Sequence, residues 1–289
     1  MSRPRARGES VGDTPRMETL RYEKDGRIGR ITLDRPERGN GITPAMPREL
    51  TEAVEQANLD PDVHVIALAG EGKGFCGGYD LVWSAESTLP NHEPGEVWDP
   101  VLDWQFMSRN VRGFMSLFHS DKPVVCKVHG FCVAGGTDMA LCSDLLVIAD
   151  DARIGYPPAR VWGVPTTMLW AHRIGAEKAK RMLFTGDLIT GAVAKEWGLA
   201  IEAPPAAELD EQFEALVGRI ANLPVNQLVM MKLLVNQALY TQGLHATQAL
   251  GTFMDGIARH TKEGYAFQQR AAEVGFKQAV RERDEPFDA

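Results

Sequence analysis

Short apolar segments alternate with amphipathic segments through residues 17–204, and only amphipathic segments follow in residues 205–289. The short segments have the length and composition of buried strands, and they are residues 18–22, 28–33, 63–69, 123–128, 144–149 and 152–155. Other segments have apolar residues at helical spacing and are predicted helices: 43–59, 101–119, 137–142, 168–174, 176–185, 192–197, 206–222, 224–239, 243–259 and 262–282. Thr43 is the predicted cap of the first of them. This order predicts an α/β core, residues 17–204, followed by a C-terminal helical region, residues 205–289.

The composition excludes several classes of protein. A chain of 289 residues can bury a full apolar core without disulfides or metal ions. Its formal net charge of −8 argues against nucleic acid as the main partner, because phosphate binding needs a basic face, although a local basic pocket could still hold an anionic cofactor. No run of about 18 apolar residues occurs, so we expect no membrane span. The cysteines lack the spacing of a zinc site and the density of a disulfide scaffold, so we expect no metal site and four buried thiols in a reducing compartment: Cys76, Cys126, Cys132 and Cys142.

Two polar segments are predicted to lie outside the packed core. Residues 1–16 contain four arginines and two prolines and lack the apolar run of a secretory signal. We interpret them as a disordered leader, with an Arg-rich targeting peptide as the alternative, and expect a cytoplasmic protein. Residues 84–100 are polar and contain three prolines, which is typical of a mobile loop that could act as a lid.

Two Gly-rich turns follow two of the apolar strands. The first reads GEGKGFCGGYDL over residues 70–81, and the second reads HGFCVAGGTDM over residues 129–139. Glycines let a backbone approach a ligand closely, and a turn that opens a helix leaves backbone N–H groups free. Two such turns could direct two N–H donors at one carbonyl oxygen, which would form an oxyanion hole. The spacing is equally compatible with two ordinary tight turns.

Other common motifs are absent from the sequence. The first turn lacks a Gly-x-Gly-x-x-Gly register that opens a helix, which a dinucleotide site requires, and no P-loop Gly-Lys-Ser/Thr occurs. No Gly-x-Ser-x-Gly elbow occurs either, which argues against a serine hydrolase of the α/β class.

Several separated segments resemble the crotonase (enoyl-CoA hydratase/isomerase) family, in the order in which the family has them. GFCGGYDL at residues 74–81 is similar to the family's A-F-(S/C/A)-A-G-(A/G)-D-(I/L) segment. The other matching segments are ITLDRP at 31–36 with Asn40, KPVV at 122–125, VHG at 128–130, AGG at 134–136, DL at 144–145, TG at 185–186 with Ala194, and WGLA at 197–200. The resemblance implies a crotonase-like spiral of ββα units with a C-terminal helical trimerisation region. It also implies a homotrimer or a dimer of trimers.

The resemblance implies roles for three residues. Tyr79 and Gly135 match the positions whose main-chain N–H groups polarise a thioester carbonyl and stabilise the enolate that forms. Asp138 matches the position of the first catalytic glutamate of the hydratases, where a carboxylate could activate water or move a proton. The alternative for Asp138 is a helix-stabilising placement in a first turn.

One position departs from the family pattern. The hydratases carry their second catalytic glutamate in an F-G-x-P-E segment, and the matching run here is IGYPP at residues 154–158. Pro158 therefore occupies the glutamate position, and its side chain cannot exchange a proton. Arg160 could bind a polar acyl group or could serve packing.

The resemblance also implies positions that contact coenzyme A (CoA). These positions are Arg38, Lys73, Gly78, Gly136 and Lys277, although a solvated surface charge is an equal alternative for each basic residue. No cofactor is expected to be bound permanently, since CoA arrives as part of an acyl-CoA substrate. The best-matching activity is that of an enoyl-CoA hydratase-like lyase. The alternatives are an isomerase, another crotonase reaction, or a catalytically weak acyl-CoA-binding protein, which Pro158 favours.

Overall fold

The computed structural model of the protein describes residues 17–81 and 97–287. The leader predicted at residues 1–16 and most of the loop predicted at residues 84–100 lie outside this part of the chain. None of the helices within these two ranges is long and apolar enough to cross a membrane.

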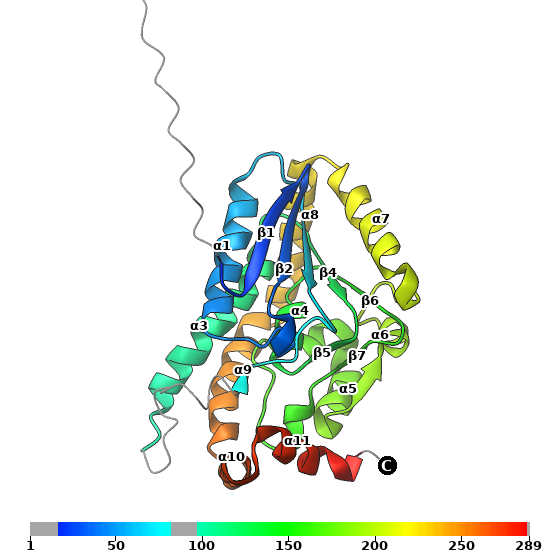
Figure 1. The fold of residues 1–289 in the computed structure, drawn as a ribbon. Helices are drawn as coiled ribbons and strands as arrows, with labels where there is room; N and C mark the ends of the chain where they lie inside the picture. Colours follow the sequence, from blue (N-terminus) through cyan, green and yellow to red (C-terminus); the bar gives the residue numbers. More distant parts are fainter. Residues whose placement is uncertain (1–16, 82–96, 288–289) are drawn as a thin grey trace, which may run out of the picture.

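A five-stranded sheet forms the centre of the molecule (Figure 1). In spatial order its strands are β1 (Leu20–Asp25), β2 (Ile28–Leu33), β3 (Val65–Gly70), β4 (Val124–Val128) and β6 (Leu145–Ile148). The β1–β2 pair is antiparallel, and every other neighbouring pair is parallel. Parallel strands covered on both faces read as continuous apolar runs, and the prediction of these strands is confirmed. β1 runs on to Asp25, beyond its predicted end.

A second, three-stranded sheet includes part of the second Gly-rich turn. It consists of β5 (Phe131–Val133), β7 (Arg153–Gly155) and β8 (Leu188–Thr190), with β7 in the middle. β5 lies within the segment predicted as a turn, and β8 was not predicted at all. Strands of three residues carry too little alternation to be recognised, because their pairing depends on distant neighbours.

Helices cover both sides of the central sheet. α1 (Ala45–Leu59) packs on β1 and β2 and against α3 (Pro100–His119), while α7 (Leu209–Ala221) packs on β2, β3 and β6. Figure 1 shows α1 and α7 on opposite sides of the sheet. The predicted Thr43 cap of α1 is wrong. Pro44 is the N-cap, its φ of −58° is already helical, and no side chain caps the helix.

Further helices follow the strands of the second sheet. α4 (Gly135–Ala140) follows β5, α5 (Leu169–Thr185) is interrupted at Gly175 as predicted, and α6 (Gly191–Trp197) follows β8. The short 3₁₀ helices η1 (Pro36–Arg38) and η2 (Pro157–Arg160) follow β2 and β7. η2 contains Pro158.

The C-terminal region is helical, as predicted. Besides α7 it contains α8 (Val225–Thr241), α9 (Leu244–Arg259), α10 (Lys262–Val274) and α11 (Phe276–Asp284). The helix predicted at residues 262–282 is divided into α10 and α11, because Gly275 has a φ of +84°, which ends the first helix. α9 packs against α3, so this region also contacts the core, and the division of the chain between residues 204 and 205 stays a prediction.

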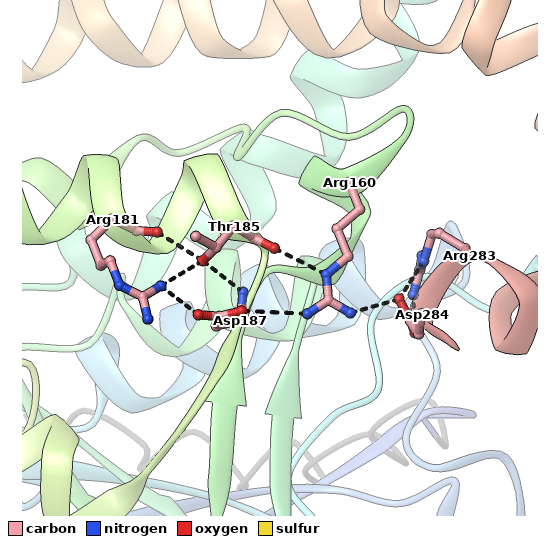
Figure 2. A network of polar contacts seen from close by, with 6 residues as sticks. All are labelled: Arg160, Arg181, Thr185, Asp187, Arg283 and Asp284. Atoms are coloured by element: carbon pink, nitrogen blue, oxygen red, sulfur yellow. Dashed lines mark hydrogen bonds and ion pairs between the residues drawn. The ribbon is translucent and has the colours of Figure 1, made fainter. Parts of the chain in front are cut away.

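Arg160 ties the end of the chain to η2, as Figure 2 shows. Its guanidinium forms an ion pair with Asp284 of α11 at 2.9 Å, and its Nε donates to the carbonyl of Thr185 at 3.0 Å. A weaker pair joins it to Asp187, which also pairs with Arg181. The Arg160 side chain is only 9% exposed. Of the two roles considered for Arg160, the packing role agrees with these contacts.

Candidate active site

The two Gly-rich turns lie side by side. The Phe75 N–H donates to the carbonyl of Phe131 at 2.8 Å, and the Val133 N–H donates to the carbonyl of Cys76 at 3.0 Å. These bonds join the first turn to β5, the strand that leads into the second turn. The site is therefore built where the end of β3 meets the start of α4.

Asn40 fixes the shape of the first turn from within. Its side-chain amide donates to the carbonyls of Glu71, Gly74 and Phe75 at 2.9 to 3.1 Å, and its oxygen accepts from the Arg35 N–H at 2.9 Å. Asn40 is fully buried and has a φ of +53°, which Asn tolerates better than most residues. This explains why a distant asparagine belongs to the pattern of the first turn.

The backbone N–H groups of Tyr79 and Gly135 are available to a ligand. Ile42 bonds to the carbonyl of Gly78 and to the N–H of Asp80, both at 2.9 Å, so the Tyr79 N–H between them points the other way. Within the described ranges neither the Tyr79 N–H nor the Gly135 N–H has an acceptor. The Tyr79 ring lies against Gly135, where a Cβ would come within 2.9 Å of Cδ2. Both free donors therefore belong to adjacent segments.

Gly78 and Gly136 allow the two turns to approach each other. Gly78 has a φ of +93°, and a Cβ on it would lie 2.8 Å from the Cβ of Ala134 and 3.3 Å from the N of Gly135. A Cβ on Gly136 would lie 2.5 Å from the carbonyl oxygen of Cys76. These glycines are thus required for backbone packing beside the free N–H groups.

Asp138 is completely buried on α4, three residues after Gly135. Its Oδ1 accepts hydrogen bonds from the backbone N–H of Thr167 at 3.1 Å and from the Thr167 hydroxyl at 3.0 Å. Its Oδ2 has no partner among the residues described. Burial raises the pKa of Asp138 from 3.8 to about 7, against the opposing effect of the Thr167 bonds. The group can therefore hold or release a proton near neutral pH.

A buried ion-pair cluster lies close to these groups and was missed in the sequence. Arg259 of α9 bonds to both carboxylate oxygens of Asp103 of α3, at 2.9 and 3.1 Å, and to Asp255 at 3.2 Å. Asp255 accepts the N–H of Val164 at 3.3 Å, and its charge contributes to the raised pKa of Asp138. Burial also raises the pKa of Asp255 itself, against the opposing charge of Arg259. The spacing of Asp255 and Arg259, four residues apart on a predicted helix, was the available signal.

The run that contains Pro158 begins next to the second turn. The Ala134 N–H donates to the carbonyl of Gly155 at 3.1 Å, which brings the start of the 155–158 run beside Gly135. The Pro158 carbonyl accepts three N–H groups from the turn that follows it. The position of the missing acid is therefore occupied by a compact turn whose Pro158 side chain exchanges no proton.

The predicted CoA contacts are distributed unevenly. Arg38 pairs with Asp80, the aspartate of the first turn, with its Nη2 2.9 Å from Oδ1, and Arg35 pairs with the same carboxylate at 2.9 Å. Lys73 and Lys277 are exposed, and neither forms an ion pair with any residue of the described ranges. Among these three basic side chains, that of Arg38 forms an ion pair with a residue of the first turn.

The His, Cys, Asp and Glu side chains of the described residues are the candidate ligands for a metal ion. Across residues 17–81 and 97–287, no three His, Cys, Asp or Glu side chains are grouped to hold a metal ion. The four cysteines are buried and unpaired, as expected, and burial raises the pKa of the Cys76 thiol to about 12.

Comparison with known proteins identifies the family of this chain. The family model for enoyl-CoA hydratase/isomerase matches residues 23–272. The chain belongs to the enoyl-CoA hydratase/isomerase family. A crystal structure of an enoyl-CoA hydratase from Mycobacterium smegmatis superposes on this chain with a TM-score of 0.90 at 57% sequence identity. The superposition covers 94% of this chain and 96% of the hydratase chain. The predicted crotonase-like fold is therefore confirmed.

More distant members of the enoyl-CoA hydratase/isomerase family also match. A Thermus thermophilus protein, provisionally named as an enoyl-CoA hydratase, is 31% identical over 249 residues, which make up 83% of this chain and 93% of that protein. A carnitinyl-CoA dehydratase of Proteus mirabilis is 29% identical over 71% of this chain and 75% of its own length. The names within the family thus include more than one reaction of CoA esters.

Proposed function

We propose that the protein is an enoyl-CoA hydratase-like lyase that adds water to the double bond of a 2-enoyl-CoA thioester. The observation that carries this proposal is the combination of two free backbone N–H groups, on Tyr79 and Gly135, with the buried carboxyl of Asp138 one helical turn away. Two donors aimed at one oxygen stabilise the negative charge that a thioester carbonyl acquires on becoming an enolate. Asp138 supplies a group that can carry the proton.

The proton balance requires only one carboxylate. Asp138, in its ionised form, accepts a proton from water as the water oxygen bonds to C3 of the acyl chain. The electrons of the double bond move to the thioester oxygen, where the N–H groups of Tyr79 and Gly135 hold the enolate. Asp138 then returns the proton to C2, which restores its charge. Pro158 takes no part in this exchange, and CoA enters only as part of the substrate.

An acyl-CoA-binding role is the second candidate, and Pro158 is the observation that favours it. The proline at this position cannot exchange a proton as a glutamate would, and proton transfer to the substrate would then be too slow for catalysis. Arg38, Lys73 and Lys277 are the proposed contacts of the CoA phosphates in either case, with Gly78 and Gly136 bordering the thioester. An isomerase or another crotonase reaction would use the same enolate with a different proton path.

We also propose a homotrimer or a dimer of trimers, with the C-terminal helical region as the contact surface. Large apolar side chains on α8 are exposed on the single chain, and they are Met230, Met231, Leu233, Leu234 and Val235. Apolar groups exposed together on one helix suit a partner of the same kind. Four unpaired buried thiols suit the reducing cytoplasm, which we propose as the location.

Turnover of short and medium trans-2-enoyl-CoA thioesters tests the proposed reaction. The assay follows loss of the conjugated enoyl absorbance for the wild type and for Asp138→Asn. We expect activity in the wild type that falls about 10²- to 10⁴-fold in the variant, because the proton carrier is removed and the donors of the oxyanion hole stay in place. If the wild type binds acyl-CoA in a calorimeter but turns over none of these thioesters, the hydratase proposal fails and the binding role takes its place.

A further inference from the structure

Three residues in or beside the site each carry a buried polar atom that has no hydrogen-bond partner in the part of the chain that the structure describes. These atoms are Asp138 Oδ2, the Tyr79 hydroxyl and the Thr166 hydroxyl, and none has a partner in residues 17–81 and 97–287. A buried polar atom is costly unless something satisfies it, so such atoms are scarce in folded proteins. One such atom on Asp138 and two on residues linked to it indicate that a polar ligand atom belongs between them.

Separate observations link Tyr79 and Thr166 to Asp138. The Tyr79 ring lies against Gly135, three residues before Asp138 on α4, and Asp138 is the charged group that most raises the pKa of the Tyr79 phenol. Thr166 precedes Thr167, which donates twice to Asp138 Oδ1, and the Thr166 N–H also acts on this carboxyl. The Thr166 carbonyl is itself held by Thr252 at 3.2 Å.

The chemistry of these atoms selects the kind of ligand atom. A phenol donates a hydrogen bond, a carboxylate accepts one, and a threonine hydroxyl can do either. An oxygen that both donates and accepts satisfies all three, which describes a water molecule or an alcohol. A methylene chain would satisfy none of them, and a carboxylate would be repelled by Asp138.

We propose that the Tyr79 side chain, together with Asp138 Oδ2, binds the oxygen that is added at C3, first as water and then as the 3-hydroxyl of the product. Thr166 completes the subsite. This inference rests on the proposed hydratase reaction and adds a second role for Tyr79, whose main-chain N–H is proposed to bind the thioester oxygen. The phenol orients the oxygen and exchanges no proton, because burial and the charge of Asp138 hold its pKa well above 10.

A purely structural role for the Tyr79 side chain is the competing explanation. Its ring packs on Phe114 with centroids 6.4 Å apart, and Asn110 of α3 lies close enough to lower the pKa of the phenol. No hydrogen bond of acceptable geometry joins Asn110 to the hydroxyl, however. If a small movement satisfied the phenol through Asn110, the hydroxyl would contribute to folding and not to ligand selectivity.

Calorimetric binding of two ligands that differ only at C3 separates these explanations. The ligands are 3-hydroxybutanoyl-CoA and butanoyl-CoA, and the proteins are the wild type and Tyr79→Phe, which keeps the backbone N–H and the ring. We expect the wild type to prefer the hydroxylated ligand, and Tyr79→Phe to lose about tenfold of that preference. Thr166→Val should lose part of the preference as well.

Tyr22→Phe is the matched control. The Tyr22 hydroxyl is also buried without a partner in the described residues, but it lies beside Gly29 of β2 and Ala57 of α1. Its removal should leave the preference unchanged. A wild type that binds both ligands equally, or a Tyr79→Phe variant that keeps the full preference, overturns the inference and leaves the proposed function intact. A wild type that binds neither ligand overturns both.

Discussion

Replacing Asp138 by Asn should make the protein more stable at pH 8 and leave its stability nearly unchanged near pH 4. Asp138 Oδ1 accepts both hydrogen bonds from Thr167, and Oδ2 accepts none. An asparagine can therefore keep its oxygen toward Thr167 and place its NH₂ group where Oδ2 was. The variant removes the buried charge and retains the shape of the side chain.

The magnitude follows from the two pKa values of this carboxyl. Burial raises the pKa of Asp138 from 3.8 to about 7 in the folded protein. Between these values the unfolded chain has released the proton and the folded protein still holds it, so the free energy of unfolding falls as the pH rises. The loss is about 1.4 kcal/mol for each pH unit, or about 4 kcal/mol across the whole interval. Above pH 7 this loss of stability stays constant. The Asp138→Asn variant has no such loss, because asparagine does not ionise.

Urea denaturation at a fixed protein concentration, from pH 5 to pH 8, measures this effect. The difference in free energy of unfolding between Asp138→Asn and the wild type should grow by about 3 kcal/mol, in favour of the variant, over that range. Asp210→Asn on α7 is the control. Its pairing with Lys127 lowers the pKa of Asp210, so its stability difference from the wild type should stay constant over this range. A difference for Asp138→Asn that also stays constant would show that the Asp138 carboxyl is not held protonated by the fold, and the reasoning would be refuted.

Three other results are expected from the same structure. The pH profile of kcat/KM should rise through about pH 7, because the reaction needs Asp138 in its ionised form and burial raises the pKa of that group to about 7; a profile that is flat from pH 5 to 9 would contradict this. Asn40→Ala should lower the free energy of unfolding by about 3 kcal/mol or more, because it leaves three buried carbonyls without their donor and puts alanine at a φ of +53°. Urea titration measures this loss, and a smaller one would contradict the prediction. Arg259→Met should cost about 3–5 kcal/mol, because Asp103 and Asp255 lose their shared partner, whereas Arg270→Ala at an exposed pair should change little; equal effects in thermal unfolding would contradict the argument.

Local patterns in the sequence were sufficient to predict most of the fold. β3 and β4 are continuous apolar runs, and α3 has apolar residues at helical spacing, so both types of element carry their own signal. β5 carries no such signal, because its three residues form a strand only by pairing with Cys76 and with β7. The division at Gly275 was missed because the apolar pattern continues on both sides of it.

Some residues of the candidate site could be predicted from local motifs, whereas their partners that are distant in the sequence could not. Tyr79, Gly135 and Asp138 lie in short motifs, so their positions were accessible from the sequence. Thr167 contacts Asp138 from 29 residues away, and Arg259 contacts Asp103 from 156 residues away. Such partners are brought together only by the packing of α5, α9 and α3 around the turns, which no local pattern records.

Infrared spectroscopy of a bound enoyl-CoA, labelled with ¹³C at the thioester carbonyl, tests the central claim most directly. If the N–H groups of Tyr79 and Gly135 polarise this carbonyl, its stretching band should move to lower wavenumber on binding. The move should persist in Asp138→Asn and in Tyr79→Phe, since both variants keep the two backbone donors. A band that stays at its solution position while the ligand is fully bound would contradict the oxyanion hole and the enolate chemistry built on it.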